Sequence, residues 1–224
     1  MSQIIIAVCV VIVCSGLGWA LFFFLAKHLR VQKLQKAHQG LTVCQQIFDI
    51  SDHIASTQMP RELRRGLVLI ANQHLQHVEG VQPEHPLLPY MRSKLARLNK
   101  IPRHHFDTKP RNKNDRKLAS ARLTQLAGII ELAVNRGEID DRDGNLARAS
   151  AQVTARQVEV ENARQASKDA ENMQAFTQAL KFAYHAQSLC TKLPPLIRET
   201  LTNAVEADIA RLKEHAAKPT QIAV

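Results

Sequence analysis

The feature that most constrains this chain is a run of 23 residues near its start, Ile4 to Ala26, that contains no charged side chain. A helix needs about 20 apolar residues to cross the roughly 30 Å of hydrocarbon in a bilayer. The alternative is a cleaved signal peptide, which has a positively charged start, a shorter apolar core and a small-residue cleavage site. Residues 1–3 carry no Lys or Arg, and the run leads into charged residues from Lys27 onward. The sequence therefore predicts a retained transmembrane anchor over residues 1–26.

The charges that flank this run predict its orientation. Basic residues near the end of a span remain on the cytoplasmic side. Four of them follow the run and none precedes it, and these are the residues that we expect to set the topology: Lys27, Arg30, Lys33 and Lys36. We therefore expect a single-pass protein of the inner (plasma) membrane, with its N-terminus outside and everything after the span in the cytoplasm.

The net charge of +10 is unevenly distributed. Residues 27–36 contribute +4 and residues 92–117 contribute +8, whereas residues 37–91 carry −2 and residues 118–224 are neutral. Aromatic residues make up only 4% of the chain, which argues against the folds that bind nucleic acid by stacking bases on aromatic side chains. The high overall charge thus reflects a basic flank of the predicted span and one further basic segment.

The part of the chain after the span shows helical periodicity, with apolar residues recurring every three to four positions. No segment alternates in the manner of a strand, so we predict an all-α fold: one N-terminal transmembrane helix and a multi-helix cytoplasmic domain with a long helical hairpin. The expected divisions are a juxtamembrane helical region over 27–100, a basic linker over 101–114, a C-terminal helical domain over 115–216 and a tail over 217–224.

Glycine and proline mark the expected ends of the helices. A helix continuing from the span over 27–58 contains Gly40, which we expect to allow a bend. Further helices are expected between Pro60 and Gly80, from Leu88 to the Pro-containing segment at 101, and from about 115 to Arg136. A turn at Gly137, followed by an Asp140 cap, is expected to start the next helix, and a last helix is expected over 195–216.

Residues 145–193 contain neither Gly nor Pro, which predicts a long unbroken helix, and Ser167, Lys168 and Asp169 form the one point at which a helix could restart. Its first part has only a thin apolar stripe, formed by Leu146, Ala149, Val153, Val160 and Ala163. Such a stripe is typical of a coiled-coil helix rather than of a core helix. We therefore predict that residues 146–166 bind a protein partner or a second copy of the chain.

Sequence motifs for catalysis, metals or cofactors are missing. There is no Gly-rich phosphate loop and no serine-hydrolase or zinc-protease motif. His74 and His77 share one helix face but lack further ligands nearby in sequence. The acidic run 140–145 resembles a calcium loop only superficially, because that alignment places an Ile and a Ser at ligand positions. We expect no enzyme activity, no metal and no cofactor, and we expect Cys44 and Cys190 to be packing residues.

The basic segment 92–117 is the one candidate binding feature. It can be a solvated linker, or it can contact an anionic surface through eight residues: Arg92, Lys94, Arg97, Lys100, Arg103, Lys109, Arg111 and Lys113. An anionic lipid is favoured over nucleic acid because the anchor holds the segment near lipid headgroups. The leading hypothesis is a membrane-anchored, non-catalytic helical scaffold or interaction protein, and the alternative is a tethered binder of anionic lipid or nucleic acid.

Overall fold

The computed structural model describes the backbone of residues 2–54, 59–100 and 113–217. The side chains in these ranges are described as well, except those of residues 2–18, 20 and 113–117. The described residues form seven α-helices and no strand, which confirms the all-α class. The helices are α1 (Ser2–Asp52), α2 (Arg61–Val81), α3 (Leu88–Asn99), α4 (Lys113–Asn135), α5 (Asp141–Asn172), α6 (Phe176–Cys190) and α7 (Pro195–Ala217).

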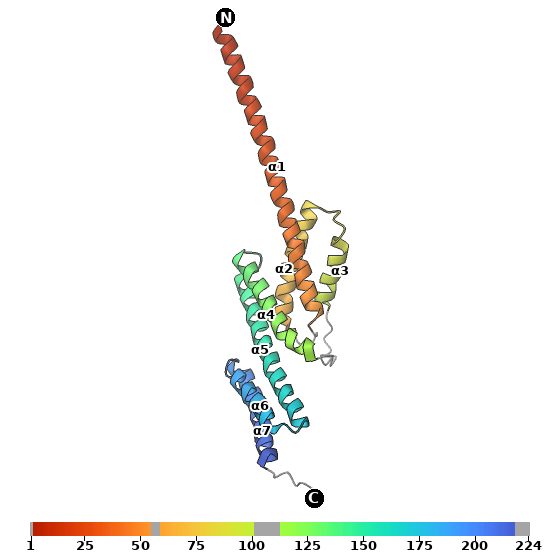
Figure 1. The fold of residues 1–224 in the computed structure, drawn as a ribbon. Helices are drawn as coiled ribbons and strands as arrows, with labels where there is room; N and C mark the ends of the chain where they lie inside the picture. Colours follow the sequence, from red (N-terminus) through yellow and green to blue (C-terminus); the bar gives the residue numbers. More distant parts are fainter. Residues whose placement is uncertain (1, 55–58, 101–112, 218–224) are drawn as a thin grey trace.

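The described part of the chain is elongated, and the start of α1 lies far from α7 (Figure 1). The N-terminal half of α1 projects away from the helical bundle, and α6 and α7 lie at the opposite end. Two separate groups of buried residues hold the bundle together. We name them the proximal core, which comprises the buried residues between Ala37 and Val158, and the distal core, which comprises those between Val160 and Leu212.

The proximal core is built from the second half of α1, from α2, α3 and α4, and from the first half of α5. Its fully buried side chains include Ile47, Leu67, Leu123 and Ile130. It therefore joins helices from both sides of the predicted 101–114 linker. Most of that linker, residues 101–112, lies outside the described residues, and α4 already begins at Lys113.

Helix α1 is continuous from Ser2 to Asp52, which agrees with a helix running on from the apolar run. The helix does not break at Gly40, where a bend was expected. The glycine instead lets α2 approach, since a Cβ at this position would lie 3.2 Å from Nδ1 of His74. A second contact, from the Cys44 thiol to the Ala71 carbonyl oxygen at 3.5 Å, shows that α1 and α2 run antiparallel.

The turn between α4 and α5 follows the sequence prediction closely. Gly137 has a φ of 68°, a left-handed conformation that costs a glycine little. Asp140 is the N-cap of α5, and its side chain accepts a hydrogen bond from the backbone N–H of Arg142 at 3.0 Å. Ile139 is buried between the two helices, which anchors the turn to the proximal core.

The unbroken helix predicted over 145–193 is wrong, because α5 ends at Asn172 and α6 starts at Phe176. Gln174 takes the left-handed conformation there, with a φ of 59°, in place of the usual glycine. Two backbone bonds close the turn, from the Gln174 N–H to the Glu171 oxygen and from the Ala175 N–H to the Ala170 oxygen. The fold-back packs Ala179 and Ala183 of α6 into the distal core, which compensates for the left-handed residue.

The distal core joins the second half of α5 to α6 and α7. The Ser167 hydroxyl donates a hydrogen bond to the Ala179 carbonyl oxygen at 2.8 Å, and both residues are buried. Charged residues link α5 to α7: Arg164 contacts the largely buried Asp208 at 2.8 Å, and Arg211 contacts Glu171 at 2.9 Å. Helix α5 thus contributes to both cores: its buried residues up to Val158 belong to the proximal core, and those from Val160 onward belong to the distal core.

Candidate functional site

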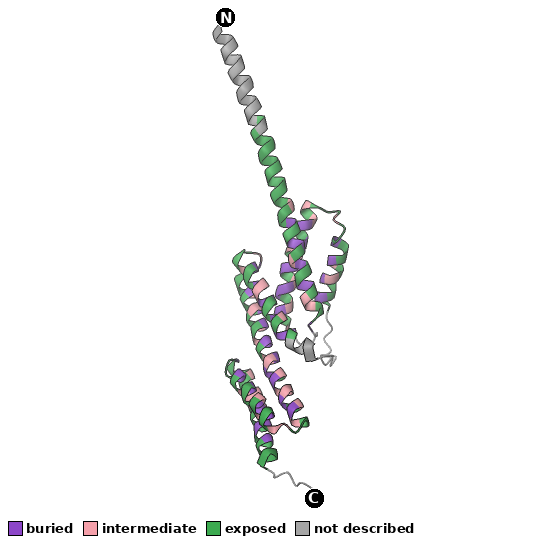
Figure 2. Cartoon of the chain, in the orientation of Figure 1, coloured by how far each residue is buried: buried purple, intermediate pink, exposed green. Residues whose placement is uncertain are grey.

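The projecting end of α1 exposes apolar side chains on every side. Trp19 and residues 21–25 are each at least half exposed, and five consecutive residues of a helix point in all directions around its axis. Figure 2 shows this part of α1 in green, clear of the bundle. The Trp19 and Phe23 rings contact one another with centroids 5.5 Å apart, but this contact lies within the helix itself. A helix that is apolar all round is stable in a protein interior or in a membrane.

Within the part of the chain whose side chains are described, no helix has a stretch both long and apolar enough to span a membrane. The span predicted over residues 4–26 lies largely outside that part, which includes only Trp19 and residues 21–26 of it.

The four residues predicted to set the topology lie on α1 between the projecting end and the bundle, and all are exposed: Lys27, Arg30, Lys33 and Lys36. They do not share one face of the helix. Arg30 and Lys33 precede the buried Ala37 by seven and four residues, so they continue the face that packs against the bundle. Lys27 and Lys36 lie to either side of that face.

The basic segment is only partly available for binding. Arg92 donates from Nε and Nη2 to the two carboxylate oxygens of Glu79 at 2.7 and 2.6 Å, and from Nη1 to Asn72 at 2.7 Å. This pair lowers the pKa of Glu79 and raises that of Arg92. Lys94 forms an ion pair with Asp52 and lies over the Tyr90 ring. Arg92 and Lys94 are thus each paired with a carboxylate of the same chain. Whether either of them also binds an external anion stays a prediction.

Of the other six predicted binding residues, the structure describes the side chains of only two. Arg97 and Lys100 are exposed at the end of α3. Arg103, Lys109 and Arg111 lie outside the described residues, and Lys113 begins α4 with a side chain that is not described. Whether these residues bind lipid or nucleic acid stays a prediction.

Of the stripe predicted on the first part of α5, Val160 and Ala163 are buried in the distal core, whereas its start is not buried. Leu146 is 52% exposed and Ala149 is exposed, whereas the buried face consists of small residues, among them Ala147, Ala151 and Ala155. Small side chains let α5 lie close to α2, where Gly66 faces Ala147. The helix packs inside its own chain, so its thin stripe does not by itself require a partner. Binding of a partner through the outer side of 146–166 stays a prediction.

Neither described cysteine is suited to act as a nucleophile. Both are buried, and burial raises the pKa of the Cys44 thiol to about 12 and raises that of Cys190. A thiol that is not deprotonated near neutral pH is a poor nucleophile. Among the described residues, no three His, Cys, Asp or Glu side chains gather in a group that could hold a metal ion.

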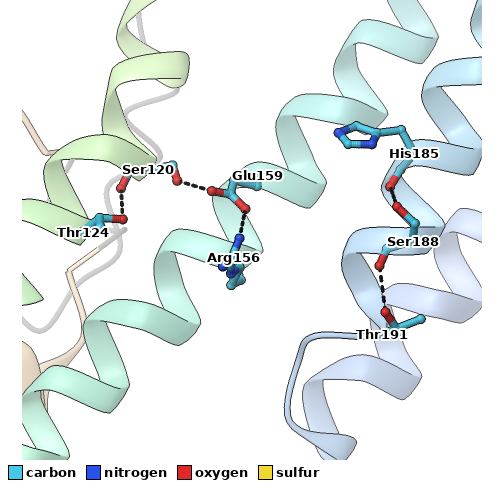
Figure 3. A network of polar contacts seen from close by, with 7 residues as sticks. All are labelled: Ser120, Thr124, Arg156, Glu159, His185, Ser188 and Thr191. Atoms are coloured by element: carbon cyan, nitrogen blue, oxygen red, sulfur yellow. Dashed lines mark hydrogen bonds and ion pairs between the residues drawn. The ribbon is translucent and has the colours of Figure 1, made fainter.

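A polar network that the sequence did not reveal lies near the transition between the two cores (Figure 3). The Ser120 hydroxyl of α4 donates to Glu159 of α5 at 2.8 Å, and Arg156 contacts the same carboxylate at 2.9 Å. On α6, the Ser188 hydroxyl donates to the backbone oxygen of His185 at 2.9 Å rather than to its ring. This is not the serine–imidazole arrangement of a hydrolase, in which the ring accepts the serine proton. The contacts of Ser120 and Arg156 with Glu159 instead connect α4 to α5.

His74 forms a second polar contact that joins three elements. Its Nε2 lies 3.2 Å from Oε2 of Glu138 in the α4–α5 turn, without the alignment of a hydrogen bond, and its ring lies against Gly40 of α1. Desolvation lowers the pKa of His74 below 6.5, opposed by the charge of Glu138 and reinforced by the nearby Arg136 and His77. The imidazole is therefore predominantly neutral in the folded protein at neutral pH.

This lowered pKa leads to a prediction about the pH dependence of stability. The unfolded chain binds a proton on His74 near pH 6.5, whereas the folded chain does so only at lower pH. The contribution of His74 to stability is therefore complete above pH 6.5 and is lost as the pH falls to the folded pKa. In urea unfolding over this range, His74→Gln should lose less stability on acidification than the wild type. Equal slopes for the wild type and His74→Gln would contradict the assignment.

Comparison of the chain with protein families, with curated proteins and with solved structures finds no match in any of the three.

Proposed function

We propose that this chain is a single-pass membrane-anchored helical scaffold that is not an enzyme. The observation that carries the proposal is the projecting end of α1, whose apolar side chains are exposed on every side and lead without a break into the proximal core. The apolar run in the sequence extends this exposed surface to 23 residues, enough for a helix of about 35 Å. A bilayer would cover this surface.

The proposed orientation places the N-terminus outside and the bundle in the cytoplasm, at the inner (plasma) membrane. The exposed cations of α1 support this orientation, because they follow the apolar run directly. The elongated shape supports a scaffold role, since the helices of the distal core lie at the end of the molecule opposite the projecting helix (Figure 1). A binding partner would therefore be held away from the bilayer.

Membrane anchoring is tested by extraction and by topology reporters. We expect the full chain to stay with membranes washed in alkaline carbonate. A variant lacking residues 2–26 should appear in the soluble fraction with an unchanged folded bundle, because the described core begins only at Ala37. The variant is checked by circular dichroism, so that loss of the anchor is distinguished from loss of the fold.

The orientation is tested in the same cells. A fluorescent protein fused to the C-terminus should fluoresce, and alkaline phosphatase fused at the same point should be inactive, because the phosphatase needs the oxidising side of the membrane to form its disulfides. The opposite pattern would overturn the orientation. A full chain that carbonate extracts completely would overturn the anchor itself.

A further inference from the structure

The continuous α1 constrains how the bundle is placed against the bilayer. Residues Lys27 to Lys36 are helical and join the proposed span to the first buried residue, Ala37, without a described break. A helix rises 1.5 Å per residue, so Lys33 lies about 10 Å beyond Ala26 along the axis. The polar headgroup layer of one leaflet is about 5–8 Å thick. The stalk between Ala26 and Ala37 thus crosses the headgroup layer and reaches its outer edge.

The pairing of α1 with α2 places another segment at this level. Gly40 lies opposite His74, and Cys44 lies opposite Ala71. Since the helices are antiparallel, Val81 at the end of α2 lies near the level of Lys33. The α2–α3 connection, residues 82–87, continues from there toward α3, and Figure 1 shows it at the end of the bundle nearest the projecting helix.

The side of α1 that faces this connection is basic. Arg30 and Lys33 continue the face formed by the buried Ala37, Leu41 and Cys44, so they lie on the same side of α1 as α2. Both cations are exposed. The stalk, the two cations and the α2–α3 connection lie at the outer edge of the headgroup layer. The α1 side of this corner has two cations, and the connection has one exposed acidic residue, Glu84, so that positive charge is in excess. The charge of this corner favours a phosphate group.

We infer that Arg30 and Lys33 bind the phosphate of an anionic phospholipid headgroup in the corner between α1 and the α2–α3 connection. The inference rests on the proposed membrane anchor and deepens it by naming the lipid class. Only two of the four cations of the stalk take part. Lys27 and Lys36 lie on other sides of the helix, where their charges add to the general attraction of an anionic leaflet without meeting the bundle.

Fluorescence of a single tryptophan tests this assignment in the full chain. The protein has one tryptophan, so Trp19→Phe removes the background signal, and Ala26→Trp places a probe on the same face of α1 as Arg30 and Lys33. The chain is reconstituted into vesicles of phosphatidylcholine and phosphatidylglycerol in constant proportion, with bromine on the acyl chains of one lipid or of the other. We expect stronger quenching by brominated phosphatidylglycerol, because that lipid is enriched beside the probe.

Two double variants with equal charge locate the site. Arg30→Gln with Lys33→Gln should remove the preference for phosphatidylglycerol, with a loss of about fivefold in relative affinity per cation. Lys27→Gln with Lys36→Gln removes the same charge and should keep the preference. Equal losses in the two variants would overturn the site and leave only general electrostatic attraction.

The remaining outcomes separate the lipid site from the anchor. No quenching by either brominated lipid would show that the probe is outside the bilayer, which would overturn the proposed anchor as well. Equal quenching by both lipids would leave the anchor in place and overturn the lipid site. Inorganic phosphate or soluble glycerophosphoglycerol should not reduce the preference. Competition by either would assign the corner to a free phosphate compound and overturn the lipid assignment.

Discussion

Replacing Gly66 with Val is expected to destabilise the proximal core strongly. A Cβ at Gly66 would lie 2.5 Å from the Cβ of Ala147, closer than two carbon atoms can approach. Both positions are on helix backbones that pack directly on each other, so α2 and α5 would have to separate. We expect a loss of about 3 kcal/mol or more in the free energy of unfolding, which is a large share of the stability of a typical domain.

Gly128→Ala is the matched control for this variant. Gly128 lies within α4, and a Cβ there would meet no atom within 4 Å. The substitution should therefore stabilise the protein by about 1 kcal/mol, because alanine favours the helix. Urea unfolding followed by circular dichroism measures both changes. If Gly66→Val were as stable as the wild type, the close packing of α2 on α5 would be wrong.

The second large effect concerns the distal core, which should unfold separately from the proximal core. Leu212 and Leu123 are both fully buried, the first in the distal core and the second in the proximal core. Truncating either to alanine should cost about 2–5 kcal/mol. Leu212→Ala should expose α6 and α7, while α2 and α4 stay protected. Leu123→Ala should do the reverse.

Hydrogen exchange followed by mass spectrometry distinguishes the two cores, because each peptide reports the opening of its own helix. The informative comparison is between peptides of α7 and peptides of α2 in each variant. Peptides from the two halves of α5 should also differ, since the change between cores falls between Val158 and Val160. A single step in which all helices lose protection together in both variants would show that the cores form one cooperative unit.

Much of the helical architecture could be predicted from the sequence, because its signals are local. Apolar residues at helical spacing predict α4 and α7, and these residues include the buried Leu123, Ile130 and Leu212. The α4–α5 turn was also predictable, because a left-handed residue and a helix cap each have a preferred amino acid, here Gly137 and Asp140.

The turn between α5 and α6 could not be predicted in the same way. No glycine or proline marks it, and a glutamine takes the left-handed position. The reason for the fold-back is the packing of small residues of α5 and α6, such as Ala163 and Ala183, in the distal core. Alanines support a straight helix equally well, so their pattern does not distinguish the two arrangements.

The candidate site was less predictable than the fold. Charge density alone selected the basic segment, but the ion pairs of Arg92 and Lys94 join residues that are 13 and 42 positions apart in the sequence. Only the tertiary fold brings such partners together. The sequence predicts that Arg30 and Lys33 lie on one face of a helix. It does not predict that this face is the one on which α2 packs.

Because α5 is shared by both cores, its length determines the distance between the two cores and also the rotation of one relative to the other about the helix axis. Each residue of an α-helix advances the chain by 1.5 Å and turns it by about 100°. One residue added between Val158 and Val160 would move the helices of the distal core outward very little, yet it would point their surface to another azimuth around the long axis. A change of seven residues would nearly restore that azimuth at a greater distance. Relatives that present the same surface to a common partner are therefore expected to vary this segment in whole pairs of helical turns.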